Sequence, residues 1–347
     1  MKLSDYDYNL PREFIAQYPA DKREQSKLLI LRRGSGEIEH RQFYQLTDYL
    51  SEGDCLVINN SKVFAARLFG KKQPTGGKVE IFLLKQIDGL KWEALVNPGR
   101  KLPPGTDVEF GDGFGCTVLE RTDVGGRIVN FHPIDDLDGA IDKYGHIPLP
   151  PYISRDDEPV DRERYQTAYA RVKGAVAAPT AGFHFTPELI RTIEDKGVSV
   201  AQITLHPSLG TFRPVTAQNP LEHKMESEYF SISDETARKI NEAIKGPGRV
   251  FAVGTTSVRT IEKSAFMDEK TGKYILKSES GYTDLYIYPG YEFKVVSALI
   301  TNFHLPKSTL LFLVSALAGR ENILNAYEEA KREGYRFYSY GDAMLIL

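Results

Sequence analysis

The amino-acid sequence predicts an α/β protein whose main domain is built from both chain ends and carries a small inserted β-rich domain. Three observations support this. Strands alternate with helical patterns beyond about residue 150, short β-rich runs fill residues 67–132, and 347 residues exceed what one hydrophobic core usually serves. We therefore expect an α/β domain over residues 1–60 and 151–347, with residues 61–150 inserted.

The first part of the chain supplies a buried strand and then the insertion. Residues 53–60 form an apolar run ending in two asparagines, which indicates a strand leading into a polar turn. The β-rich runs that follow are residues 79–84, 92–96, 117–119 and 128–131. Their close spacing, with Gly and Pro between them, predicts a small barrel or sandwich. The proline-rich residues 147–152 and the acidic residues 156–158 are typical of a linker.

Beyond the linker, helices and strands alternate. Residues 187–196 have a helical pattern closed by Gly197, and a strand follows over residues 198–205. Ser233 is placed to cap a helix that ends at Lys245, and residues 249–253 form the next strand. This alternation is typical of an α/β core.

The composition excludes several classes of protein. With 41% hydrophobic residues, 18 Phe and 19 Tyr, the chain can bury a core, which excludes disorder. Lys and Arg number 44 against 47 Asp and Glu, and the formal net charge of −3 excludes a globally basic surface. Two cysteines are too few for a disulfide scaffold or a thiolate zinc site.

The sequence also predicts no membrane segment. The first residues turn acidic too early for a signal peptide, and the most apolar run, residues 310–318, is shorter than the roughly 20 residues that span a bilayer. We expect a cytoplasmic protein without membrane contact.

Two glycine-rich segments resemble nucleotide sites but lack the required context. Residues 111–115 read G-D-G-F-G, and the β-branched residues that follow predict a hairpin turn instead of a helix. Residues 76–79 lack the first glycine and the hydroxyl residue of a phosphate-binding loop. We interpret both as turns.

Residues 251–262 are a stronger candidate for ligand binding. A buried strand leads into Gly254, then Thr255, Thr256 and Ser257, then a helix that carries Arg259. Hydroxyls and free N–H groups at a helix N-terminus suit an anion, which the arginine could pair with. The alternative is that one hydroxyl residue simply caps the helix.

Four histidines lie in turn-like or polar contexts of the α/β part: His184, His206, His223 and His304. No pair has the spacing of a metal-binding helix and no thiolate accompanies them, so we predict no metal site. A single histidine is usually structural, but four in such loops favour at least one acid–base role.

One segment is strongly basic. Lys62, Arg67, Lys71, Lys72 and Lys78 follow one another without an intervening acid. This pattern suits a polyanionic partner, although a solvated charged face would produce it as well.

Seven segments together resemble one family, the S-adenosylmethionine:tRNA ribosyltransferase-isomerases of queuosine biosynthesis. They are residues 5–11 (DYDYNLP), 59–68 (NNSKVFAARL), 145–153 (GHIPLPPYI), 173–185 (KGAVAAPTAGFHF), 252–259 (AVGTTSVR), 299–310 (LITNFHLPKSTL) and 335–344 (YRFYSYGDAM). The segments are long, occur in order and cover both expected domains.

The resemblance implies a reaction and a fold. The ribosyl part of S-adenosylmethionine would move onto 7-aminomethyl-7-deazaguanine at the wobble position of a tRNA anticodon. It would rearrange to an epoxycyclopentanediol, with release of adenine and methionine. The implied fold is an α/β-barrel-like domain with an inserted β-barrel. S-adenosylmethionine is then a co-substrate, no cofactor stays bound, and a monomer is expected.

The resemblance also suggests roles for residues. A base must remove the C5′ proton that the sulfonium acidifies, and His184, His223 or Glu228 are candidates. His304 or Asp342 would protonate adenine. Contacts to S-adenosylmethionine are expected from Thr255, Thr256, Ser257, Arg259 and Asn302. The basic segment would contact tRNA phosphates, and Phe183, Phe303 or Tyr340 would stack on an unpaired base if they are not core residues.

The chain departs from the family pattern at two places. Glu226 stands where a second histidine is expected after His223, and Pro207-Ser208 replaces the usual Val-Gly after His206. Three other functions remain possible from the residues alone: an enzyme for an anionic small molecule, a non-catalytic RNA-binding protein and a methyltransferase. The last lacks the glycine-rich strand–helix turn that such enzymes use.

Overall fold

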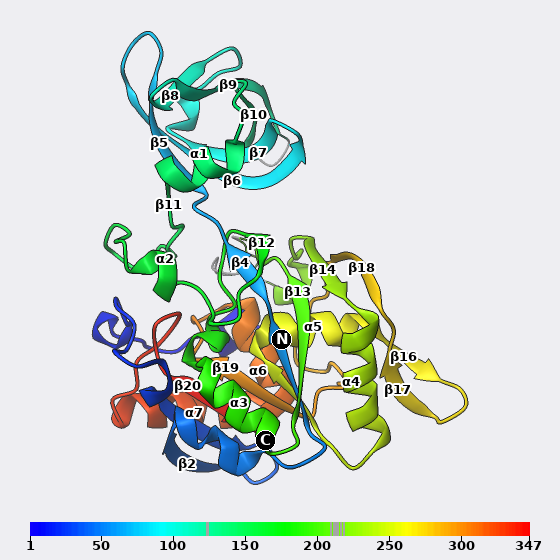
Figure 1. Cartoon of the computed structure of the whole chain (residues 1–347). Coiled ribbons are helices and arrows are strands. Elements are labelled where there is room, and N and C mark those ends of the chain that lie inside the picture. Colours follow the sequence, from blue (N-terminus) through cyan, green and yellow to red (C-terminus); the bar gives the residue numbers. More distant parts are fainter. Residues whose placement is uncertain (123–124, 209, 211–214, 216, 218) are drawn as a thin grey trace.

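The computed structural model describes residues 1–122, 125–208, 210, 215, 217 and 219–347. A large mixed sheet with helices on both faces forms the main body, and a small β-barrel stands beyond it, joined by two extended connections (Figure 1). The prediction of an α/β main domain with an inserted β-barrel is confirmed. The exact boundaries at residues 60/61 and 150/151 stay a prediction.

The main sheet has nine strands in the order β18-β14-β13-β3-β15-β19-β20-β1-β2. In that order they are Glu279–Thr283, Glu228–Ile232, Ser199–Leu205, Cys55–Asn59, Val250–Val253, Ala298–Asn302, Ala343–Ile346, Lys27–Arg32 and Glu37–Gln42. The four central strands β13, β3, β15 and β19 are mutually parallel. Strand β20 runs antiparallel to β19 and parallel to β1, and β14 runs antiparallel to β13.

Alternating side chains of these strands enter two hydrophobic cores, one on each face of the sheet. Leu29 and Val57 belong to one core, while Leu28 and Ile58 belong to the other. The first core is covered by α4–α7, which are Asp234–Lys245, Gly254–Ser264, Thr309–Ala318 and Arg320–Arg332. The second is covered by α3, Pro187–Asp195, and the 3-10 helix η4, Phe43–Tyr49.

The inserted barrel is closed by six antiparallel strands. They are β5 Arg67–Lys72, β6 Lys78–Asp88, β7 Lys91–Asn97, β10 Arg127–Phe131, β9 Phe114–Arg121 and β8 Asp107–Gly111, and β8 pairs back onto β5. Helix α1, Leu137–Tyr144, packs into the barrel core, and β11, Gly145–His146, pairs with β5. The choice between barrel and sandwich is thereby settled in favour of the barrel.

The connecting segments carry short elements. Strand β4, Ser61–Val63, pairs with β12, Val172–Ala175, beside the main sheet, and β16, Ala265–Asp268, pairs with β17, Lys273–Leu276. Helix α2 is Asp161–Arg164. The remaining 3-10 helices are Leu3–Tyr6, Arg12–Phe14, Arg23–Gln25, Gly99–Lys101, Thr180–His184 (η6) and Pro220–Glu222.

Both glycine-rich segments are turns, as predicted. Asp112 and Gly113 have positive φ values of 46° and 79° and join β8 to β9. Two successive positive φ values are typical of tight hairpin turns, which explains a glycine there. Gly76 and Gly77 lie between β5 and β6. No helix in the described part of the chain is long and apolar enough to cross a membrane.

Candidate active site

The chemistry-bearing residues gather at one edge of the main sheet because of its strand directions. The parallel strands β3, β13, β15 and β19 all end there, and the antiparallel β14 and β20 begin there. The carboxyl ends of parallel strands are where α/β folds place ligands. The sheet thus brings together residues that lie up to about 280 positions apart in the sequence.

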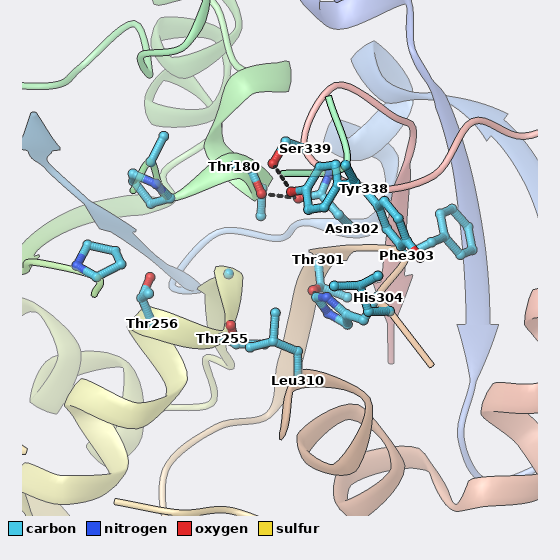
Figure 2. A pocket seen from close by; sticks show the side chains of 17 residues that line it. Thr180, Thr255, Thr256, Thr301, Asn302, Phe303, His304, Leu310, Tyr338 and Ser339 are labelled. Carbon is cyan, nitrogen blue, oxygen red and sulfur yellow. Dashed lines mark hydrogen bonds between the residues drawn. The ribbon is translucent and has the colours of Figure 1, made fainter. Parts of the chain in front are cut away.

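A small pocket opens at this edge. Figure 2 shows Thr255 and Thr256 of α5 on one side and Asn302, Tyr338 and Ser339 on the other, with His304 and Leu310 below. Its remaining lining comes from neighbouring segments: Tyr152, residues 178–181, Pro207, Gly254, Thr301, Phe303 and Leu305. Four of the predicted site residues, Thr255, Thr256, Asn302 and His304, therefore share one cavity.

The turn from β15 into α5 leaves donors facing the pocket. Gly254 begins α5 with a φ of +83°, a conformation that favours glycine. The N-cap position is Val253, and no side chain caps the helix, so the alternative that a hydroxyl residue caps α5 is wrong. The first N–H groups of a helix have no partner within it. These groups and the Thr255 hydroxyl are available to a ligand.

Asn302 ties the pocket to His184 behind it. The Asn302 Oδ1 accepts a hydrogen bond from the Thr180 hydroxyl at 2.8 Å (Figure 2), and its Nδ2 lies 3.3 Å from His184 Nε2. The opposite ring nitrogen, His184 Nδ1, lies 2.7 Å from the Ser26 hydroxyl. Burial, with Arg336 and Arg23 nearby, lowers the pKa of His184 to about 3. His184 is therefore a neutral residue that orients Asn302, and it does not line the pocket.

His304 is the histidine that faces the pocket. Its Nε2 lies 2.8 Å from the Thr301 hydroxyl, its backbone N–H donates to the Tyr327 hydroxyl at 3.0 Å, and its carbonyl accepts from the Tyr8 hydroxyl. Burial lowers the pKa of His304 to about 3, so the ring is neutral near pH 7. Thr301 fixes the ring, and the Tyr327 and Tyr8 hydroxyls fix the backbone. Together they hold His304 in one orientation.

Asp342 does not reach the pocket. Its two carboxylate oxygens accept hydrogen bonds from the backbone N–H groups of Lys27, at 2.9 Å, and Arg336, at 2.7 Å. Burial raises the pKa of its carboxyl group. These bonds fix the start of β20 to the start of β1, so Asp342 has a structural role.

Arg259 and Ser257 also point away from the pocket. The Arg259 guanidinium forms a buried ion pair with Glu228 and donates to the carbonyls of Leu285, at 2.9 Å, and Thr283, at 3.4 Å. The Ser257 hydroxyl donates to the Val253 carbonyl at 2.7 Å. We expected Arg259 and Ser257 to face an anion together with Thr255. This expectation does not match the geometry, because both side chains point into the protein interior, away from the pocket.

A second, larger cavity lies between the barrel and the main domain. It includes Glu228 and His206 and shares Pro207 with the first pocket. The His206 Nδ1 lies 2.7 Å from the buried Ser61 hydroxyl, and burial lowers the pKa of His206. No particular catalytic step was predicted for His206 from its sequence context, although it follows a predicted buried strand directly.

His223 lines neither cavity. Its ring packs edge-on against Tyr286 with ring centroids 5.7 Å apart, and burial lowers its pKa while Glu226 opposes this effect. Glu226 itself lines the cleft between the domains. The departing residues Pro207 and Ser208 line the same cleft.

The basic segment is split between two places. Lys71 and Lys78 are cross-strand partners on the β5–β6 hairpin, at the end of the barrel farthest from the main domain (Figure 1). Lys72 on the same strand donates to the Lys101 carbonyl at 3.0 Å, and Arg67 pairs with Glu80 at 2.8 Å. Lys62 lies apart from them on β4.

The aromatic residues suggested for stacking are core residues instead. Phe183, Phe303 and Tyr340 are all buried, and Phe303 packs among other aromatic rings of the main core. Among the residues that the structure describes, no group of three His, Cys, Asp or Glu side chains could hold a metal ion.

Comparison with known families decides the identity of the chain. A model of the family described as queuosine biosynthesis protein matches residues 3–346. The chain belongs to this family. The fit covers both the barrel and the main sheet, and the expected resemblance to an enzyme of queuosine biosynthesis is confirmed.

Individual members of the queuosine biosynthesis family are similar over the whole chain. An S-adenosylmethionine:tRNA ribosyltransferase-isomerase of Symbiobacterium thermophilum is 53% identical over 348 residues, and one of Acetivibrio thermocellus is 50% identical over 347 residues; both comparisons cover 100% of each chain. A solved S-adenosylmethionine tRNA ribosyltransferase of Thermotoga maritima is 38% identical, with a TM-score of 0.55, covering 99% of this chain and 100% of that one.

Proposed function

We propose that this protein transfers and isomerises the ribosyl group of S-adenosylmethionine onto 7-aminomethyl-7-deazaguanine at the wobble position of tRNA. Adenine and methionine leave, and the tRNA carries the epoxycyclopentanediol. One observation supports this assignment beyond the family: the pocket at the sheet edge and the cleft toward the barrel adjoin at Pro207. A small co-substrate and a base of a large one can therefore meet inside the molecule.

S-adenosylmethionine is assigned to the pocket at the sheet edge. The N-terminus of α5 and the Thr255 and Thr256 hydroxyls offer donors for the methionine carboxylate without help from Arg259. Asn302, whose amide His184 and Thr180 orient, offers a polar edge for the nucleoside. Arg259 is therefore assigned a positioning role instead of a contact with the ligand. Its ion pair with Glu228 joins α5 to β14.

His304 is assigned to the adenine that leaves. A neutral imidazole fixed by Thr301 can hydrogen-bond the purine ring of the leaving adenine. Asp342 supports this region through its hydrogen bonds to backbone N–H groups and an ion pair with Arg336.

His206 is assigned to removal of the C5′ proton. Of the three groups expected for this step, His184 lies behind Asn302, His223 lines neither cavity, and Glu228 is engaged by Arg259. The neutral ring of His206 lies in the cleft directly before Pro207, and Ser61 holds its Nδ1. The amine of the modified base is the nucleophile, so the enzyme needs none of its own.

Lys71, Lys72 and Lys78 are assigned to phosphates of the anticodon stem, with Lys62 and Arg67 nearer the main domain. One chain forms both cavities, so we expect a monomer. We also expect it to work in the cytoplasm, with S-adenosylmethionine as a co-substrate and no resident cofactor.

Product analysis by mass spectrometry tests the proposal. The protein is incubated with S-adenosylmethionine and an anticodon stem-loop that carries the aminomethyl-deazaguanine. We expect free adenine, free methionine and an RNA that has gained the ribosyl mass. S-adenosylhomocysteine together with a methylated RNA would identify a methyltransferase instead, and RNA binding without consumption of S-adenosylmethionine would identify a binding protein.

A further inference from the structure

The cleft between the barrel and the main domain has an aromatic wall that the assignments above leave unused. Tyr229 on β14 and Tyr282 on β18 are directly paired across the strands, and their rings lie 5.8 Å apart at 74°. Tyr229 is 37% exposed and Tyr282 is 52% exposed. Two adjacent exposed aromatic rings that line one cavity form a contiguous apolar surface of the kind that marks ligand-binding grooves.

The aromatic wall continues to the assigned catalytic histidine. The His206 ring is nearly parallel to that of Tyr229, at 25° and 5.7 Å between centroids. A series of rings, Tyr282, Tyr229 and His206, thus leads through the cleft toward Pro207 and the pocket at the sheet edge.

The barrel supplies the opposite side of the cleft. Phe64, Leu84 and Trp92 line it there, and the Lys85 ammonium lies 4.9 Å from the centre of the Tyr282 ring. The cleft therefore has an aromatic and partly apolar wall with a cation at its aromatic face, and its lining also includes charged side chains of both signs. These features match an unpaired base with its attached phosphate, since proteins bind such bases by aromatic stacking combined with basic side chains.

We propose that Tyr229 and Tyr282 form the platform on which an unpaired base of the tRNA anticodon stacks, so that the wobble base extends past His206 into the pocket. The proposal rests on the proposed function, because it names the part of the tRNA that the adjoining cleft takes. Bases of a tRNA anticodon loop stack on one another, so the wobble base must leave its stack to enter a cavity, and a protein stacking surface offsets that cost.

Equilibrium binding of an unmodified anticodon stem-loop, followed by fluorescence anisotropy, tests the proposal without requiring turnover. Replacing a stacking aromatic by alanine costs about 1–3 kcal/mol per base, so Tyr282→Ala should weaken RNA binding by about 5- to 150-fold. Tyr282→Phe keeps the ring and should bind within about 2-fold of the wild type. Tyr44→Ala is the matched control, because Tyr44 is 50% exposed on η4, outside the cleft.

Steady-state kinetics separate a stacking role from a structural one. Tyr282→Ala should raise the KM for the modified stem-loop while the KM for S-adenosylmethionine stays unchanged. Equal RNA affinity in the wild type, Tyr282→Ala and Tyr229→Ala would overturn the platform, and so would a loss that Tyr282→Phe does not rescue. If the wild type binds RNA through these rings but releases no adenine, the proposed function fails while the platform stands.

Discussion

At the scale of single residues, burial decides which histidines can act. His184 and His304 are both kept neutral by a pKa of about 3, but only His304 faces the pocket, because Asn302 stands between the pocket and His184. His206 is less enclosed, and its pKa is lowered by burial as well. Position relative to the cavity therefore distinguishes three chemically identical side chains.

The pH dependence of the reaction follows from His206. A general base must be neutral, and a histidine whose pKa lies below 6.5 stays neutral down to a lower pH than a free one. We expect the acidic limb of the profile of kcat/KM to have its midpoint below pH 6.5. His206→Gln should remove this limb and lower kcat by at least about 100-fold. A limb that persists in His206→Gln would exclude this histidine as the base.

The Arg259–Glu228 ion pair belongs to the same scale. Both side chains are almost fully buried, and breaking such a pair leaves one charge uncompensated. We expect Glu228→Gln to lower the free energy of unfolding by about 3–5 kcal/mol, as measured by urea denaturation. The double variant Glu228→Gln/Arg259→Met should be less destabilised than the sum of its two single variants. Additive effects would mean that the two side chains are not coupled.

At the scale of elements, the sequence predicted some of the strands and helices and only part of the site. Periodicity and capping residues identified α3, α4, β13 and β15 within a residue or two, because these are local properties. The site depends on strand order, which no local pattern contains. Whether α5 turns Arg259 toward a ligand or toward Glu228 is fixed by β14 and β18, which are distant in the sequence.

The turn that begins α5 gives a prediction at this scale. An added Cβ at Gly254 would lie 3.5 Å from Ala181 Cβ, an ordinary contact, so Gly254→Ala acts through its φ of +83°. We expect a loss of about 1–2 kcal/mol in stability and weaker binding of S-adenosylmethionine in calorimetry. Gly272→Ala is the control, because Gly272 has a φ of +66° with no atom near its Cβ position and lies in the β16–β17 turn. Equal affinities in both variants would contradict a role of this turn in binding.

At the scale of the whole molecule, the barrel and the main domain contribute different parts of the binding surface. The main sheet builds the pocket, and the barrel closes one side of the cleft and presents Lys71 and Lys78 at its far end. This division explains how a chain with a net charge of −3 can bind RNA, since the cations are local to the hairpin.

The salt dependence of RNA binding tests this division. Each phosphate contact contributes about 0.7–0.9 to the slope of log K against log salt concentration. Lys71→Glu/Lys78→Glu should therefore lower that slope by about 1.5 and weaken binding, while the KM for S-adenosylmethionine stays constant. Lys270→Glu, on the exposed β16–β17 turn, serves as the control. An unchanged slope in the double variant would place the RNA elsewhere.

The central claim is that S-adenosylmethionine binds at the sheet edge, where α5 begins. The Thr255 hydroxyl lines this pocket and forms no hydrogen bond within the part of the chain that the structure describes. Calorimetric titration of Thr255→Val with S-adenosylmethionine, beside Thr192→Val on the exposed side of α3, is the most direct test. A hydrogen bond to a charged group contributes about 1.5–3 kcal/mol, so we predict a Kd at least about 10-fold higher for Thr255→Val alone. An unchanged Kd would contradict the claim and move the ligand out of this pocket.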